Sequence, residues 1–465
     1  MENNFWDSST WQTFHLIAAL LLAMLVANGL KQVIPALRRS LIPTSVLGGL
    51  MLLGLAAVYQ KITGQVMFNT AFFGGNGIAN LEIITYHCLA LGFIATSLKT
   101  SDRKLTKLRR WEIFNTGVTT VSTYLLQGTV GLIITIGAAL LIDGFFPAAG
   151  MLLPFGFGQG SGQALNYGGL FENDFGFDGG KSFGLTVAAL GFLSASLGGV
   201  FHLNMLRVRG RVIGDGEEGY GVMNESIEDD NEIPMNGSMD KLTVQITLIG
   251  IAYMMTNFVM WSLRLVLPGM TALIYGFNFL LGVLCATLVK VALQMLKKFG
   301  LVKRQYTNNF LLTRCGNVFF DLMVVAGIAA IRLDVLENYW GIMLVLGIAG
   351  MAVTYFYVRF VCKVLFRRYQ EEQFLGMYGM LTGTASTGII LLREIDTDFK
   401  TPAADNMVYQ NFPAIVFGFP LMLIVPLTPV APVKIMLLLA AFFLVMQVLL
   451  FRTKIFRRRR RKKAH

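Results

Sequence analysis

The sequence predicts an all-α integral membrane protein of about eleven transmembrane helices. Of its 465 residues, 54% are hydrophobic and only 14% are charged, whereas an ordinary soluble domain carries roughly 25% charged residues. Apolar runs long enough to cross the hydrocarbon core of a bilayer, about 20 residues each, recur along the whole chain. Two stretches rich in glycine and small polar residues, 154–169 and 376–388, interrupt this pattern.

The apolar runs define the expected helices in order along the chain. The N-terminal ten residues are polar and acidic and no cleavable signal peptide is evident, so we expect the first helix to be retained. The four cysteines show no close pairing or metal-ligand spacing and are expected to be free, buried thiols. The predicted spans are 11–30, 41–59, 80–99, 112–142, 182–206, 242–265, 272–296, 309–331, 339–364, 406–427 and 432–452.

Basic residues occur in alternate loops and predict the topology. They cluster at 38–39, 99–110 and 207–211 in the first part of the chain, and at 297–304 and 367–368 in the second. Because basic loops stay cytoplasmic, we expect a multi-pass protein of the inner (plasma) membrane with the N-terminus outside and the C-terminus in the cytoplasm.

The basic run at 457–463 follows a membrane span directly. Such a run typically contacts the anionic headgroups of membrane lipids. We therefore expect membrane lipids as partners and no nucleic acid.

The loop charges also divide the chain into two related halves. The acidic segment 212–241 lacks apolar periodicity and predicts a cytoplasmic linker. Residues 1–211 and 242–430 each contain an odd number of spans, so they predict two inverted five-helix repeats. Residues 431–465 add a further transmembrane helix and a basic cytoplasmic tail.

The glycine-rich stretches follow the fourth long span of each half. Non-helical backbone survives at membrane depth only where protein buries it or a watery cavity meets it. We therefore predict a re-entrant hairpin near 148–170 that enters from outside and another near 371–393 that enters from inside. Their tips are expected to meet at a transport site near the midplane. The alternative is that the glycines only allow helices to pack closely.

The polar residues of the two breaks suit a charged ligand. The N-termini of half-helices attract carboxylates, and unwound carbonyls suit a small cation. The candidate substrate-binding residues are Gln159, Gly160, Ser161, Gly162, Gln163, Asn166, Thr382, Gly383, Thr384, Ser386, Thr387 and Arg393. The guanidinium of Arg393 is suited to gripping a carboxylate, but pairing with its neighbours Glu394 and Asp396 is an alternative.

A cation site is predicted mainly from Asp321, which lies in the middle of an apolar span. An intramembrane carboxylate is costly and is typical of an ion path. The alternative is a structural partner of Arg314, seven residues earlier. The candidate Na⁺ ligands are Asp321, Asn317, Gln127 and Asn411.

Several segments spread over most of residues 11–427 form a recognisable series: Leu41–Gly49, His87–Leu98, Leu125–Gly128, the first break, Gly191–Gly199, Cys315–Met323, and the second break followed by Asn411–Pro413. In this order they resemble the bacterial sodium/glutamate symporter family. The resemblance implies a membrane homodimer of two inverted five-helix halves that takes up glutamate with Na⁺ by an elevator-like movement. The chain departs from the family in the looser glycine patterns of Gly156–Gly162 and Gly379–Gly383 and in its last span.

The leading hypothesis is a Na⁺-coupled symporter of glutamate or a related small carboxylate. A passive channel or facilitator, and a non-transporting membrane scaffold, remain as alternatives. An enzyme is not expected, because the sequence shows no metal-binding His/Glu spacing, nucleotide-binding loop or nucleophile-base set.

Overall fold

The computed structural model describes residues 8–100, 106–209, 232, 239–302, 304–396 and 400–462. Within these ranges the chain is helical, apart from turns and one isolated bridge between Glu232 and Gln305. Ten helices of the described part are long and apolar enough to cross a membrane, and the bent pair Ala403–Tyr409 and Pro413–Leu427 makes an eleventh if it is one span. The prediction of an all-α, multi-pass membrane protein is confirmed.

The chain folds as two compact units, and each unit draws segments from both halves of the sequence. The first unit comprises residues 1–28, 44–104 and 220–330, and the second comprises residues 29–43, 105–219 and 331–465. The units therefore do not coincide with the predicted halves. Each half places its first three long helices in the first unit, apart from the end of the first helix, and its remaining helices in the second.

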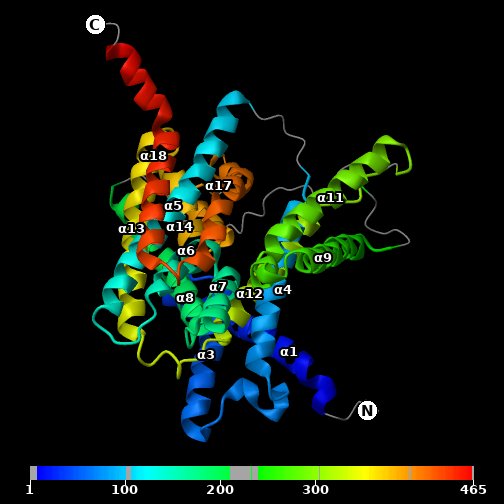
Figure 1. Cartoon of the computed structure of the whole chain (residues 1–465). Coiled ribbons are helices and arrows are strands. Elements are labelled where there is room, and N and C mark those ends of the chain that lie inside the picture. The colour runs from blue at the N-terminus through cyan, green and yellow to red at the C-terminus, as the bar shows by residue number, and fades with distance from the viewer. Residues whose placement is uncertain are drawn as a thin grey trace. The chain divides into compact units, whose positions relative to one another are not determined.

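The first unit is a bundle of long helices (Figure 1). In it α12 packs along α3 and α4, and α11 packs on α4 and α9. Glycine permits the closest of these contacts, because a Cβ added at Gly92 of α4 would lie 2.7 Å from the ring of Phe320 of α12. Its long helices are α1 (Ser8–Val33), α3 (Thr44–Thr63), α4 (Gly77–Ser97), α9 (Lys241–Val266), α11 (Asn278–Lys298) and α12 (Asn309–Ala329), with the short elements η1 (Met67–Asn69), η2 (Ala71–Phe73), η4 (Pro268–Met270) and α10 (Thr271–Gly276).

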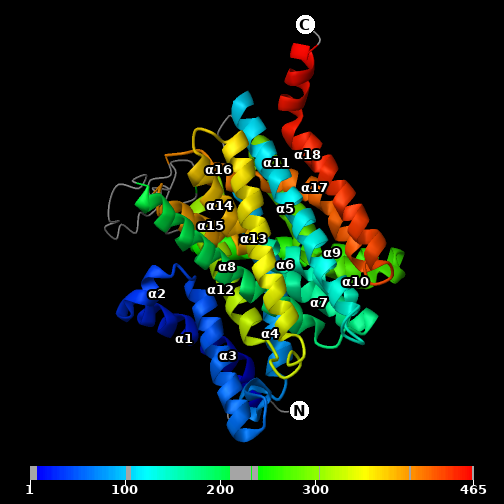
Figure 2. The ribbon, with the colours of Figure 1, turned by 90° about the vertical axis from the view of Figure 1, so that its left-hand side faces the viewer.

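The second unit is built around α5, which packs against α13, α17 and α18 (Figure 2). At 33 residues α5 is about 50 Å long. The elements of this unit are α2 (Pro35–Arg39), α5 (Lys107–Ala139), η3 (Pro147–Met151), α6 (Leu152–Gln159), α7 (Ser161–Phe175), α8 (Gly180–Val208), α13 (Trp340–Leu365), α14 (Gln370–Thr382), α15 (Ala385–Arg393), α16 (Ala403–Tyr409), α17 (Asn411–Ile424), η5 (Val425–Leu427) and α18 (Pro432–Lys462).

A run of buried hydroxyls lies along α5, which explains how a polar helix can occupy the centre of a membrane unit. Thr116, Thr119, Ser122 and Thr123 each donate a hydrogen bond of 2.7–2.8 Å to the carbonyl four residues earlier. The hydroxyls are thereby satisfied inside their own helix. They do not have to be paired by neighbouring helices.

The tightest contact in the second unit joins α5 to η3. A Cβ added at Gly131 would lie only 2.2 Å from the carbonyl oxygen of Gly150. Thr135 supports the same contact, because its Oγ1 donates to the Pro147 carbonyl at 2.7 Å and accepts from the Gly150 amide at 3.1 Å. The approach of these two backbones therefore requires glycine.

Some sequence predictions fall outside the described residues and others are confirmed. Most of the predicted linker 212–241, except Glu232 and residues 239–241, lies outside the described ranges, and so do the side chains of the basic run 457–463. All four cysteines are buried and free, as predicted.

Substituting Gly131 with Ala should destabilise the protein by about 2 kcal/mol, because the added methyl group meets backbone that cannot give way. Gly137 lies on the same helix, and a Cβ there meets nothing within 4 Å. Gly137→Ala should therefore leave stability unchanged or raise it by up to about 1 kcal/mol. Thermal unfolding of the two variants in one detergent compares them, and equal effects would contradict the packing argument.

Candidate functional site

The first glycine-rich stretch is helical except at one residue. Gly160 separates α6 from α7 with φ of 80° and ψ of −172°, a backbone conformation that essentially only glycine adopts. The sequence predicted a broken segment, and the break is confined to this position. The neighbouring glycines serve close packing, since a Cβ at Gly156 would lie 2.8 Å from the Ala188 amide nitrogen and one at Gly168 would lie 2.4 Å from the Gly180 carbonyl oxygen.

Several buried polar groups lie in the first two turns of α7. Helix α7 begins with no side-chain cap. Within the described residues, the Ser161 hydroxyl, both polar atoms of the Gln163 amide and the Tyr167 hydroxyl have no hydrogen-bond partner. Ser161 is 0% exposed and Gln163 1% exposed. Leaving such a group unpaired costs about 1–3 kcal/mol, so the first two turns of α7 are a candidate binding site.

The second glycine-rich stretch breaks between α14 and α15, at Gly383 and Thr384. Thr384 is the N-cap of α15 and accepts a hydrogen bond of 3.4 Å from the Thr387 amide. Thr382 donates its hydroxyl to the Tyr378 carbonyl at 2.7 Å, inside α14. The two limbs lie close together, because a Cβ at Gly379 would be 2.7 Å from the Cα of Gly388.

The ends of α6 and α14 meet at one place on α8. A Cβ added at Gly191 of α8 would lie 2.5 Å from the Thr382 carbonyl oxygen and 3.1 Å from the Cα of Phe157. Phe192, the next residue of α8, contacts Gly383, whose added Cβ would lie 3.2 Å from its ring. The two breaks, about 220 residues apart in the sequence, therefore lie next to each other in the second unit.

Gln127 of α5 joins this meeting point from another side. Its Nε2 donates to Thr354 Oγ1 of α13 at 2.8 Å and to the Leu381 carbonyl at the end of α14 at 3.0 Å. Its Oε1 is buried and has no hydrogen-bond partner among the described residues. An unpaired amide oxygen beside the carbonyl end of a helix is a group that a small cation can use.

The four predicted Na⁺ ligands do not all lie in one unit. Gln127 and Asn411 belong to the second unit, whereas Asn317 and Asp321 lie on α12 of the first. The Asn411 amide oxygen accepts a hydrogen bond of 3.1 Å from Gln410. Among the described residues, no group of three or more His, Cys, Asp and Glu side chains could hold a metal ion. A Na⁺ site here would use amide and carbonyl oxygens.

Asp321 and Asn317 are exposed on one face of α12, one helical turn apart. The Asp321 carboxylate lies within hydrogen-bonding reach of Ser45 on α3. Arg314, the alternative partner predicted from the sequence, has its guanidinium 5.0 Å above the ring of Phe310 instead.

The remaining predicted substrate residues occupy different surroundings. Gly162 is buried near Gly160 at the first break. Gln159 and Asn166 are half-buried, and Ser386 is exposed at the start of α15. Arg393 lies in the last turn of α15, two turns from the break. Its neighbour Glu394 pairs with Arg207 of α8 at 3.6 Å.

A buried charge cluster at the start of α14 was missed in the sequence. Glu371 accepts from Arg359 of α13 through both carboxylate oxygens and lies 2.9 Å from Nε2 of His202 on α8. The other ring nitrogen of His202 lies 2.8 Å from the Tyr355 hydroxyl. The available signal was a carboxylate placed before the second break, with one arginine and one histidine that each lie inside an apolar span. The cluster ties α8, α13 and α14 together.

Replacing Glu371 with Gln should destabilise the second unit by about 3 kcal/mol, because it leaves the mostly buried guanidinium of Arg359, 12% exposed, without its counter-charge. Glu372→Gln is the matched control, since Glu372 is the adjacent carboxylate and is only half-buried. Thermal unfolding in detergent measures both. Equal stability of the Glu371→Gln variant and the wild type would show that the ion pair contributes nothing.

Comparisons with known proteins add no family assignment to this geometry. No family model and no curated protein sequence matches the chain.

Proposed function

We propose that the protein is a secondary transporter that carries a small carboxylate, with glutamate as the first candidate, together with Na⁺. The observation that carries this proposal is the meeting of two helix breaks around buried polar groups that lack partners. Helix packing alone does not account for these groups, because packing requires small residues and gains nothing from unpaired amides.

The start of α7 suits a carboxylate. Its first backbone amides have no side-chain cap, and the partial positive charge of a helix N-terminus favours an anion. The Ser161 hydroxyl and the Gln163 amide add neutral donors at the same end. A carboxylate bound there would satisfy groups that are otherwise unpaired.

The end of α14 suits the accompanying cation. The last carbonyls of a helix carry partial negative charge, and the unpaired Oε1 of Gln127 belongs to the side chain that donates to Leu381 in this turn. Anion and cation would then occupy neighbouring positions, so each would strengthen the binding of the other. This mutual attraction is the physical basis of coupled transport.

The order of elements supports inverted repeats. Each half places three helices in the first unit, then a long helix, a broken pair and further helical structure in the second. With the topology inferred from the basic loops, η3 to α7 would be a re-entrant hairpin entering from outside, and α14 to α15 one entering from inside. The second unit would then carry the site as one body, as an elevator-like mechanism in a homodimer requires.

The resemblance of several segments to the sodium/glutamate symporter family supports the same function. Among them are Gly191–Gly199 and the residues around Gln127, which are those that contact the ends of α6 and α14. The resemblance and the geometry thus point to one set of residues. Glutamate is therefore the first substrate to test.

The function is tested by uptake of labelled glutamate and other small carboxylates into proteoliposomes with an imposed Na⁺ gradient. A Na⁺-coupled transporter should accumulate substrate only with Na⁺ outside, and it should show counterflow. A pore would show no counterflow, and a scaffold would show no uptake. Asp321→Asn should weaken the dependence of uptake on Na⁺ if that carboxylate lies on the ion path.

The control for Asp321 is Asp334→Asn, which removes an exposed carboxylate paired with Arg332. It should transport as the wild type does. Unchanged Na⁺ activation in the Asp321→Asn variant would assign that residue a structural role.

Replacing Gln163 with Met should separate ligand binding from stability. Because the Gln163 amide is buried and unpaired, its removal should raise the unfolding temperature of the ligand-free protein while abolishing the stabilisation that substrate gives. Gln447→Met is the matched control. Its amide donates to the Tyr357 hydroxyl at 2.7 Å, so this variant should lose stability and keep the ligand effect. If substrate still stabilised the Gln163→Met variant and no longer stabilised the Gln447→Met variant, the substrate would bind away from Gln163.

A further inference from the structure

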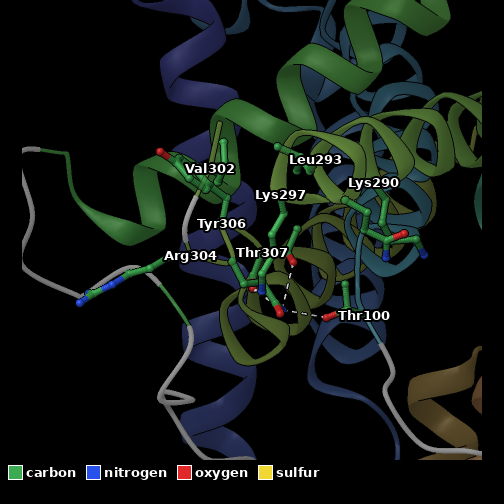
Figure 3. Close-up of a pocket in the computed structure, with 10 residues that line it drawn as sticks. Thr100, Lys290, Leu293, Lys297, Val302, Arg304, Tyr306 and Thr307 are labelled. Atoms are coloured by element: carbon green, nitrogen blue, oxygen red, sulfur yellow. Dashed lines mark hydrogen bonds between the residues drawn. The ribbon is translucent and has the colours of Figure 1, made fainter. Parts of the chain in front are cut away.

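A pocket of about 220 Å³ lies at one end of the first unit, whereas the helix breaks belong to the second unit. Three segments far apart in the sequence form it: Thr100 after the end of α4, one face of α11, and the loop before α12. On α11 the lining residues follow helical spacing, so they project to one side. Figure 3 shows Lys290, Leu293 and Lys297 together on this helix, with Tyr306 and Thr307 on the loop. The residues that line it are Thr100, Lys290, Leu293, Gln294, Lys297, Val302, Arg304, Gln305, Tyr306 and Thr307.

The lining is basic and rich in hydrogen-bond donors. Lys290, Lys297 and Arg304 contribute positive charge, and none of the ten lining residues is acidic. Lys290 is already engaged, because its ammonium donates to the Ser97 carbonyl at 2.9 Å and the Lys99 carbonyl at 3.2 Å. Lys297 is half-buried, and Arg304 extends outward on the loop side (Figure 3).

The loop side of the pocket is held in place by buried polar contacts. Gln245 of α9 donates to the Tyr306 carbonyl at 2.9 Å and accepts from the Asn308 amide at 3.0 Å. The Asn308 side chain donates to Glu232 at 2.6 Å, and Glu232 pairs with the buried Lys241 at 2.8 Å. Among the described residues, Glu232 is thus paired with Lys241 and does not line the pocket.

Two hydrogen bonds from Gln305 connect the segments that line the pocket. The Gln305 side chain donates to Thr100 Oγ1 at 2.9 Å and to the Thr307 carbonyl at 3.0 Å. This bond joins the loop to the end of α4. The pocket is therefore formed before any ligand arrives, which lowers the entropic cost of binding.

We propose that this pocket binds the phosphoryl group of an anionic membrane lipid. Lys and Arg side chains together with hydroxyl donors are the groups that recognise phosphate, and the ten residues that line the pocket include all three types without an acidic residue. The volume equals that of about seven water molecules, which accommodates a phosphate and its glycerol linkage. Basic pockets between helices on the cytoplasmic side bind lipid headgroups, and the loop charges assign this end to the cytoplasm.

Exposed apolar side chains on another face of α11 favour a lipid over phosphate from solution. On α11 the side chains of Leu284, Leu288, Val291 and Met295 are 38–58% exposed. They form an apolar track on the helix that also carries Lys290 and Lys297. Acyl chains can lie along this track while the headgroup occupies the pocket.

The test uses the full-length protein in a neutral detergent. Separate samples receive phosphatidylglycerol, phosphatidylcholine or inorganic phosphate. The unfolding temperature is measured for each sample, and bound lipid is counted by native mass spectrometry. Phosphatidylglycerol should bind and stabilise the wild type, and phosphatidylcholine should not. The variant Lys297→Gln with Arg304→Gln should bind phosphatidylglycerol about tenfold more weakly. Stabilisation by inorganic phosphate alone, lost in this variant, would support the phosphoryl site and assign its ligand to the solution.

The matched control is Lys298→Gln with Arg368→Gln, which removes the same two types of charge from exposed positions that do not line the pocket. It should bind as the wild type does. Equal binding by both double variants, or equal effects of the two lipids on the wild type, would overturn the proposal. Lys297→Arg with Arg304→Lys keeps both charges and should restore binding.

Discussion

Every backbone amide and carbonyl at membrane depth needs a hydrogen-bond partner. The second unit contains two places where a helix ends and its last backbone groups must find partners outside that helix. At Gly160 and at Gly383 the chain leaves one helix and begins another within one or two residues. The carbonyl of Gly158 accepts from the Tyr124 hydroxyl at 2.9 Å, and that of Leu381 accepts from Gln127 at 3.0 Å. Helix α5 thus supplies partners to the ends of both α6 and α14.

Glycine in this protein acts mostly through close approach and only rarely through backbone freedom. Gly191 lets α8 approach the ends of α6 and α14, and Gly131 lets α5 touch η3. Gly160 is the exception, since its φ of 80° is needed to separate two helices without a loop. The helix ends at the two breaks can therefore approach one another only because the surrounding helices present glycine at the points of contact.

Charged side chains lie at the first turn of α14, and the residues where the two breaks meet are neutral. The Glu371, Arg359 and His202 cluster ties three helices together at the first turn of α14, with its charges paired. The residues at the meeting point, such as Gln127, Ser161 and Gln163, are neutral. In the proposed transporter, a site of neutral dipoles would leave the anion and the cation to balance each other's charge.

Composition, apolar run length and loop charge are properties of local sequence. They were sufficient to predict the all-α membrane class, the ten long apolar helices of the described part and the position of both breaks. The same signals overestimated the extent of the breaks, because glycine that allows packing and glycine that interrupts a helix look alike in a sequence. They also did not predict that each unit would combine helices from both halves, or that Asp321 and Gln127 would belong to different units. Those outcomes depend on contacts between residues hundreds of positions apart, such as Gln127 with Leu381 and Gly191 with Thr382. Only tertiary packing, where side-chain shape and backbone hydrogen bonding are satisfied together, decides them.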